Sequence, residues 1–284
     1  MNGLQQALLL GVGLPALAAL ILAGVIAGLT RLQNRFSESG LAFALALSFG
    51  LAIWLTFQGI VFPPREASHW LVYLCLAEGL LALLLAAPQP VISLLAWVAG
   101  SIFAAWTSLH YLATGNSSSI VLVIVGGAIV AISGGLFHSL VAPRRTAAET
   151  LLGFAVTAGV GALTIFFGGS ATIGQLCGTF GLIFAAAFFA LLPFTRRLGQ
   201  PLSFLYWTCL AALLLNATLF AGLSWIPAVL VWLAPFGLAA VPRFQASGLG
   251  RRIGSLILSG LAPAVIAGIA FIIVYLAAGA SSEM

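Results

Sequence analysis

Long apolar segments, separated by short polar or turn-forming connections, run through the whole chain. Of 284 residues, 62% are hydrophobic and 5% are charged, whereas a soluble domain carries about 25% charged residues. Because backbone groups in lipid must be hydrogen-bonded internally, only helices or closed barrels cross a bilayer. The unbroken apolar runs lack the alternation of barrel strands. The sequence therefore predicts an all-α, polytopic transmembrane helical bundle.

The length and spacing of the apolar segments predict about ten spans. A helix needs about 20 residues to cross a hydrocarbon layer about 30 Å thick. Thr146 and Glu149 have capping-box spacing, which predicts a helix start near Ala147. We expect residues 1–284 to form a single integral membrane domain, with its first span retained rather than cleaved. The predicted spans are 7–29, 40–61, 69–87, 91–113, 120–141, 151–168, 174–194, 202–222, 225–241 and 253–278.

Arginine placement predicts how the spans are oriented. Short basic loops belong on the cytoplasmic side of a membrane. Successive arginine clusters in the chain are separated by four, two and two predicted spans, so all of them are expected on one side. Both termini are then expected on the extracytoplasmic side. The clusters are Arg31 with Arg35, Arg144 with Arg145, Arg196 with Arg197, and Arg243 with Arg251 and Arg252.

The chain contains neither lysine nor aspartate, and this excludes several classes of membrane protein. All ten basic residues are arginine and all five acidic residues are glutamate. Without lysine there is no Schiff base for retinal or pyridoxal phosphate. Without aspartate, the aspartate-rich metal–diphosphate sites of membrane prenyltransferases have no ligands. Because the arginines lie between apolar runs, we expect no nucleic-acid binding.

Glu78 is the most informative single residue, since it falls near the middle of the third predicted span. An ionisable group at that depth costs about 2.5–3.5 kcal/mol on insertion scales. One interpretation is a proton or cation site inside the bundle. The other is a protonated or hydrogen-bonded structural residue packed against a neighbouring helix. Gln58, Gln175 and Asn216 are the other candidates for a substrate or proton site within the spans.

A polar patch is predicted on the outer side, after Pro63 and Pro64. Arg65, Glu66 and His69 lie there, and His110 lies near the outer end of the fourth predicted span. We consider these four residues candidates for an outer entrance. His110 and His138 fall at opposite ends of their spans, so they are not expected to form a bis-histidine haem site. No metal site is predicted.

Neither the placement of the cysteines nor a search for catalytic motifs gives much evidence for an enzymatic activity. Cys75, Cys177 and Cys209 fall inside apolar runs and are expected to be small buried side chains. The chain has no GxSxG, HExxH or P-loop motif. An intramembrane hydrolase using His138 with Ser133 or Ser139 remains an alternative. An enzyme is nevertheless the less favoured class.

Two function classes follow from these features. The first is a permease or flippase for a small or amphipathic solute, driven by protons through Glu78 and located in a bacterial cytoplasmic membrane. The alternative is a noncatalytic transmembrane subunit of a respiratory or photosynthetic complex, acting as a scaffold or a quinone-binding subunit. The scarcity of polar residues within the spans favours the alternative. The expected partners are the lipid bilayer and, for the alternative, other membrane subunits. No cofactor is predicted, with a bound quinone or lipid left open.

Overall fold

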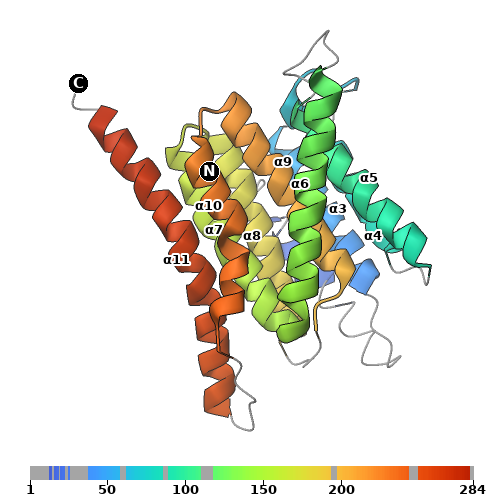
Figure 1. The fold of residues 1–284 in the computed structure, drawn as a ribbon, viewed down its shortest axis with the longest axis vertical. Helices are drawn as coiled ribbons and strands as arrows, with labels where there is room; N and C mark the ends of the chain where they lie inside the picture. The colour runs from blue at the N-terminus through green and yellow to red at the C-terminus, as the bar shows by residue number, and fades with distance from the viewer. Residues whose placement is uncertain are drawn as a thin grey trace.

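The regular structure of this chain is helical. The computed structural model describes residues 38–57, 62–85, 89–109, 118–192, 197–242 and 249–281, with isolated positions between 13 and 25. Throughout this described part the elements are helices, without a strand (Figure 1). They are α3 (Glu38–Thr56), η2 (Ala67–His69), α4 (Trp70–Leu84), α5 (Pro90–Leu109), α6 (Ser118–Leu140), η4 (Ala142–Arg144), α7 (Ala147–Phe167), α8 (Ala171–Leu191), α9 (Gln200–Phe220), α10 (Trp225–Leu233), η5 (Ala234–Ala240) and α11 (Leu249–Ser281).

Eight of the described helices are long and apolar enough to cross a membrane. The prediction of an all-helical, multi-pass membrane protein is therefore confirmed at this level. Predicted spans two to eight and span ten each correspond to one of these helices. The predicted first span, 7–29, lies largely outside the described residues.

The predicted ninth span, 225–241, differs from a regular membrane helix. Its α-helical part, α10, has 9 residues, and the chain continues as the 3-10 helix η5. Pro235 lies in the first turn of η5. A proline has no backbone N–H and its ring collides with the carbonyl four residues earlier, so it kinks or breaks an α-helix. The α-helix is broken at Pro235, whereas α11 continues through Pro263. The hydrophobicity of the segment was visible in the sequence, but this break was not predicted from it.

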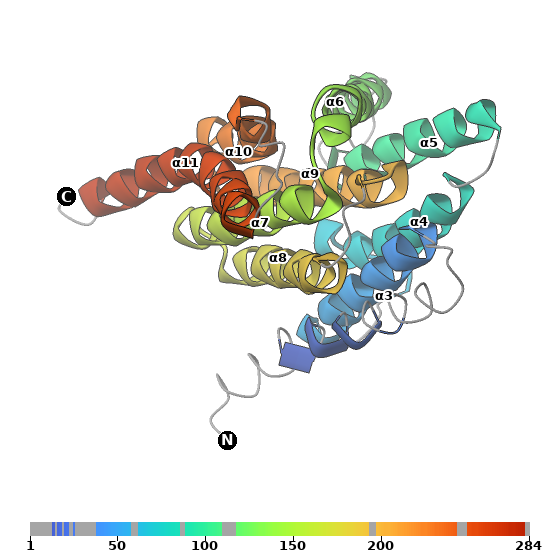
Figure 2. The same cartoon turned by 90° about the horizontal axis from the view of Figure 1, so that it is seen from below.

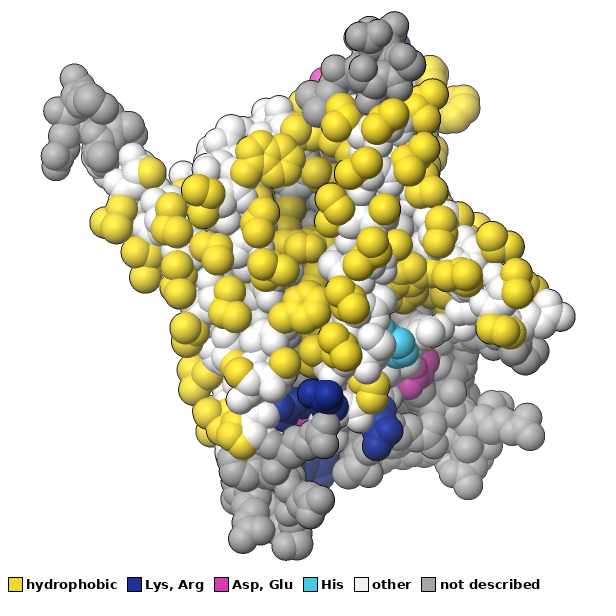
Figure 3. Space-filling model, in the orientation of Figure 1, with side chains coloured by type: hydrophobic (Ala, Val, Ile, Leu, Met, Phe, Trp, Pro, Cys, Tyr) yellow, Lys and Arg dark blue, Asp and Glu magenta, His cyan; other side chains and the backbone are white. Residues whose placement is uncertain are grey.

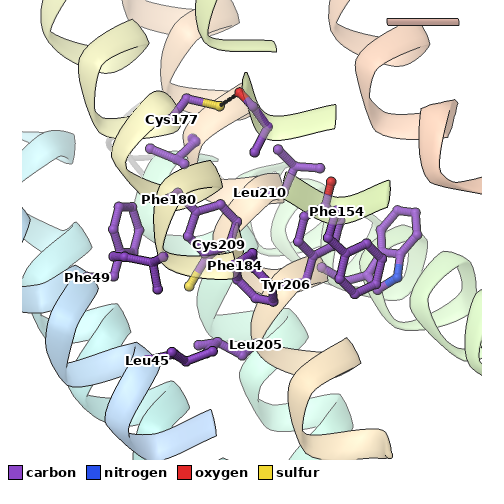
Figure 4. Packing of buried hydrophobic residues seen from close by; sticks show 14 of the residues in the cluster. Leu45, Phe49, Phe154, Cys177, Phe180, Phe184, Leu205, Tyr206, Cys209 and Leu210 are labelled. Atoms are coloured by element: carbon purple, nitrogen blue, oxygen red, sulfur yellow. Dashed lines mark hydrogen bonds between the residues drawn. The ribbon is translucent and has the colours of Figure 1, made fainter. Parts of the chain in front are cut away.

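Helix α9 forms the centre of the bundle. It contacts α3, α4, α5, α6, α7, α8 and α10 (Figure 2). Its middle is packed among aromatic rings, and Tyr206 stacks on Phe154 with ring centroids 3.7 Å apart (Figure 4). A helix that is apolar on all sides is expected to be buried on all sides. Side chains on α9 are consequently the ones that meet residues from most other helices.

The surface of the bundle carries an apolar belt. Large hydrophobic side chains are exposed along α5, α6, α10 and α11, and they cover the middle of the face seen in Figure 3. Hydrocarbon is the environment in which such a surface is stable. The belt indicates which surfaces of the helices contact lipid.

Most arginine side chains seen in Figure 3 gather at one end of the bundle. There Arg145, which is 5% exposed, donates a hydrogen bond to the carbonyl oxygen of Val241, and Arg252 donates one to that of Leu192. We call this end, which also includes Arg144 and Arg197, the arginine end. The loop with Arg65 lies at the other end, which we call the Arg65 end. The predicted clustering is confirmed for these arginines, whereas Arg31, Arg35, Arg196 and Arg243 lie outside the described residues.

The predicted capping box at the start of α7 is confirmed, and it gives a testable stability effect. The Thr146 N–H donates to Glu149 Oε2 at 2.8 Å, and the Glu149 N–H donates to Thr146 Oγ1 at 3.2 Å. Glu149 Oε1 also accepts a hydrogen bond from Ser255 on α11.

Glu149→Ala removes both the capping box and the hydrogen bond to α11, so we expect the free energy of unfolding to fall by about 2 kcal/mol. Thermal unfolding in detergent measures the loss. Thr146→Ser keeps the hydroxyl acceptor and is expected to lose little, and equal losses in both variants would contradict the assignment.

Candidate functional site

The Glu78 side chain lies at a junction of three helices. It belongs to α4 and is 0% exposed. A Cβ atom added at Gly100 of α5 would lie 2.7 Å from Glu78 Oε2, so the α5 backbone sits directly against the carboxyl group. The hydroxyl of Thr208, on α9, lies beside the same carboxyl group. The absence of a side chain at Gly100 therefore makes room for Glu78.

The polar surroundings of Glu78 are sparse. Neither carboxyl oxygen forms a well-aligned hydrogen bond with any described residue. The Thr208 hydroxyl donates its own proton to the carbonyl oxygen of Phe204 at 2.9 Å. Its oxygen can accept a hydrogen bond from a protonated Glu78, whereas toward an ionised Glu78 the hydroxyl would turn its proton away from the Phe204 carbonyl and donate to the carboxylate. A single neighbouring hydroxyl stabilises a charged Glu78 poorly, so water or a cation would be needed to complete its surroundings.

Two thiols lie close to the same junction. Cys209, next to Thr208 on α9, interacts with Cys75 of α4 and lies within electrostatic reach of Glu78. The third cysteine, Cys177, donates instead to the carbonyl oxygen of Ala158 at 3.3 Å (Figure 4). All three are buried and free of disulfides, as expected from the sequence. They provide native reporters at two separate places in the bundle.

A cavity of about 460 Å³ opens at the Arg65 end. Its lining includes Arg65, Glu66 and Asn216, three of the residues that the sequence predicted as site or entrance candidates. Asn216 is 2% exposed, and its amide donates to Ser108 Oγ at 2.8 Å and to the Ala212 carbonyl oxygen at 3.0 Å. Opposite charges thus lie at the mouth of this cavity, and a buried amide lies in its wall.

A tight turn between α7 and α8 contributes to the same cavity. Gly169 has a φ of +125°, which side-chain-bearing residues rarely adopt. A Cβ atom there would lie 2.4 Å from the carbonyl oxygen of Ala221. The close approach of the two segments places Ser170 and Ala221 together in the cavity wall. Only glycine permits this arrangement of backbone.

The remaining sequence candidates are not gathered at this site. His69 accepts a long hydrogen bond from the Arg65 N–H, at 3.4 Å, and stays near the mouth of the cavity. Gln175 lies in a separate groove of about 770 Å³ between α7 and α8. Gln58 and His110 fall outside the described residues. Within the described part of the chain, no group of three or more His, Cys, Asp or Glu residues could hold a metal ion.

An aromatic layer separates Glu78 from the arginine end. The added Cβ at Gly100 would lie 2.3 Å from Phe204 Cζ, so the Phe204 ring and the carboxyl group share one small space. Phe204 is fully buried, and its ring centroid lies 5.3 Å from that of Trp97. The Trp97 indole N–H donates to the Ala131 carbonyl oxygen at 3.0 Å, which fixes the ring. These two rings close the Glu78 junction on that side.

The polar positions of α9 follow one another along the bundle axis. Gln200 lines a cavity at the arginine end, Thr208 lies beside Glu78, and Asn216 lines the cavity at the Arg65 end. Eight helical residues span about 12 Å, so Glu78 lies about midway between two cavities. The sequence singled out Asn216 but missed Thr208, Gly100 and Phe204. No pattern in the sequence distinguishes Thr208 from Ser203 and Thr218, which are polar residues of the same helix.

Comparison with known proteins identifies no family for this chain. No family model matches the chain, and no match is found among curated proteins.

Proposed function

We propose that this chain is a permease that moves a small or amphipathic solute across a membrane by alternating access, with Glu78 as an exchangeable proton site. The carrying observation is a fully buried carboxyl group with sparse polar surroundings among the described residues, at a helix junction between two cavities. Buried ionisable groups inside membrane bundles commonly mark ion or substrate pathways. This placement matches what a coupled transporter requires.

The chemistry of the junction supports coupling between protonation and movement. A neutral Glu78 fits the closed, dry junction, where Thr208 can accept its proton in a hydrogen bond. An ionised Glu78 needs water, and water enters when helices separate toward one cavity. Each protonation state therefore favours a different arrangement of α4, α5 and α9. A ligand that binds one arrangement better shifts the balance between them.

The proposed orientation in the membrane follows from the arginines. The arginine end carries Arg144, Arg145, Arg197 and Arg252, and basic loops favour the cytoplasmic side. We assign the arginine end to the cytoplasm, and the cavity lined by Arg65 and Glu66 to the outer side. In this scheme both termini are extracytoplasmic, and the membrane is a bacterial cytoplasmic membrane. The outer cavity offers both charges to an approaching zwitterionic or polar solute.

The function is tested with liposomes that contain the purified chain and a luminal pH dye. Amino acids, sugars and organic cations are added one class at a time, and a fluorescent phospholipid tests movement of lipid. We expect one class to change luminal pH, or the phospholipid to cross, only when the protein is present. If no solute class changes luminal pH and the phospholipid does not cross, the proposed transport is rejected.

A subunit of a larger membrane complex is the second candidate function. Gly159 lines the groove between α7 and α8, and a Cβ atom added there would meet no atom within 4 Å, so another helix could approach closely at this position. Gentle purification distinguishes the two functions. Partners that co-purify at fixed stoichiometry support the subunit, whereas a monodisperse single chain supports the permease.

A further inference from the structure

A second cavity, of about 680 Å³, lies at the arginine end between α4, α5, α6 and α9. Ser93, His138, Ser139 and Gln200 provide its polar lining. Apolar side chains, including Leu94 and Ile132, provide most of the rest. We call it the arginine-end cavity. Its mixture of polar and apolar walls is typical of a site for an amphipathic ligand.

Several polar groups of this cavity are available to a ligand. Ser93 Oγ donates to Gln200 Oε1 at 2.9 Å, and the Gln200 amide retains two N–H donors. His138 Nδ1 is buried and has no hydrogen-bond partner in the described part of the chain. Ser139 Oγ donates to the Leu136 carbonyl oxygen at 3.1 Å and keeps an acceptor lone pair. The Nδ1 atom is enclosed by protein, so His138 would meet a ligand through the rest of its ring, which lines the cavity.

The lining also limits the charge of the ligand and its route of entry. No arginine or glutamate is among the described residues that line this cavity, so it offers no counter-charge to an ionic headgroup. Leu94 on α5 is 64% exposed and Ile132 on α6 is 62% exposed, and both border the cavity. They belong to the apolar belt that faces lipid. The cavity is thus reached from the bilayer between α5 and α6.

We propose that the arginine-end cavity binds a neutral lipid-like molecule whose headgroup carries carbonyl or hydroxyl oxygens. The headgroup oxygens pair with Gln200 and His138, and the apolar tail lies against Leu94 and Ile132. The Phe204 and Trp97 rings separate this cavity from Glu78. Glu78 lies beyond these rings, so Glu78→Gln is expected to leave binding in this cavity unchanged.

Gly135 provides the sharpest test of this site. It lines the cavity, and a Cβ atom added there would meet no atom within 4 Å. A side chain can therefore begin at this position without a clash, and Gly135→Leu is designed to occupy part of the cavity. Gly159 on α7 also has open space around an added Cβ, but it lines the groove between α7 and α8. Gly159→Leu is the matched control.

Native mass spectrometry of the full-length chain in detergent measures binding of three added probes. A short-chain ubiquinone and dioctanoylglycerol are neutral, and dioctanoylphosphatidate is anionic. We expect a neutral probe to bind the unmodified chain, with affinity at least about tenfold lower in Gly135→Leu, roughly tenfold lower in His138→Phe, and unchanged in Gly159→Leu. Binding of the quinone alone or the glyceride alone identifies the headgroup. The proposal is overturned if no neutral probe binds, if the anionic probe binds equally well, or if Gly135→Leu binds like the unmodified chain.

Discussion

Glu78→Gln is expected to reduce solute movement coupled to a pH gradient to the level of protein-free liposomes. Glutamine has nearly the same shape as a protonated glutamate, so it fits the junction of α4, α5 and α9, but it cannot release a proton. The junction is also closed, and among the described residues it offers an ionised carboxylate little beyond the Thr208 hydroxyl. We therefore expect the variant to fold with at least the stability of the unmodified chain while losing coupled transport. The measurement is uptake into liposomes that contain a luminal pH dye.

Glu66→Gln is the matched control for this prediction. Glu66 is exposed and lines the mouth of the cavity at the Arg65 end, whereas Glu78 is buried. Removal of the Glu66 charge is expected to change the KM for a charged solute and to leave coupling intact. Retained coupling in Glu78→Gln would show that the buried glutamate is a structural residue. Loss of coupling in both variants would place the proton site elsewhere.

Gly100→Val is expected to lower the free energy of unfolding by about 3 kcal/mol, because the Glu78 junction has no room for a side chain on α5. An added Cβ would lie 2.3 Å from Phe204 Cζ and 2.7 Å from Glu78 Oε2. Both distances are shorter than real side chains tolerate, and both neighbours are fully buried. Thermal unfolding in detergent measures the loss.

The control for Gly100→Val is Gly268→Val on α11. A Cβ atom added at Gly268 would meet no atom within 4 Å, so we expect a change of less than about 0.5 kcal/mol. Adding Phe204→Leu to Gly100→Val removes part of the nearest ring and is expected to recover part of the lost stability. Equal losses at Gly100 and Gly268, or no recovery in the double variant, would contradict the described packing.

The features that could be predicted from the sequence are those set by local physics. Long apolar runs in a chain with few charges leave only membrane helices, and the described part of the chain contains eight of them. The capping box at Thr146 depends on a four-residue pattern, and it is formed. The ninth predicted span departs from a regular helix because Pro235 interrupts the hydrogen bonding of its backbone.

The composition of the candidate site was harder to predict, because it depends on which helical faces meet. Glu78 was identified by its depth in a span, which is a local property. Its neighbours Gly100 and Thr208 lie far away in the sequence, and no spacing rule links them to Glu78. Gln175 is as polar as Asn216, but α8 turns it toward the groove with α7. Only the packing of the helices determines which of these polar residues lies at the candidate site.

Water access to the Glu78 junction is the central claim, and Cys209 reports on it. The double variant Cys75→Ala with Cys177→Ala leaves Cys209 as the single thiol, close to Glu78. The double variant Cys75→Ala with Cys209→Ala leaves Cys177, which lies between α7 and α8. The decisive measurement is the labelling of both double variants in sealed vesicles with a membrane-impermeant thiol reagent, added to either side. Alternating access predicts that Cys209 is labelled from each side while Cys177 stays unlabelled. Protection of Cys209 from both sides, under either direction of the pH gradient, would contradict it.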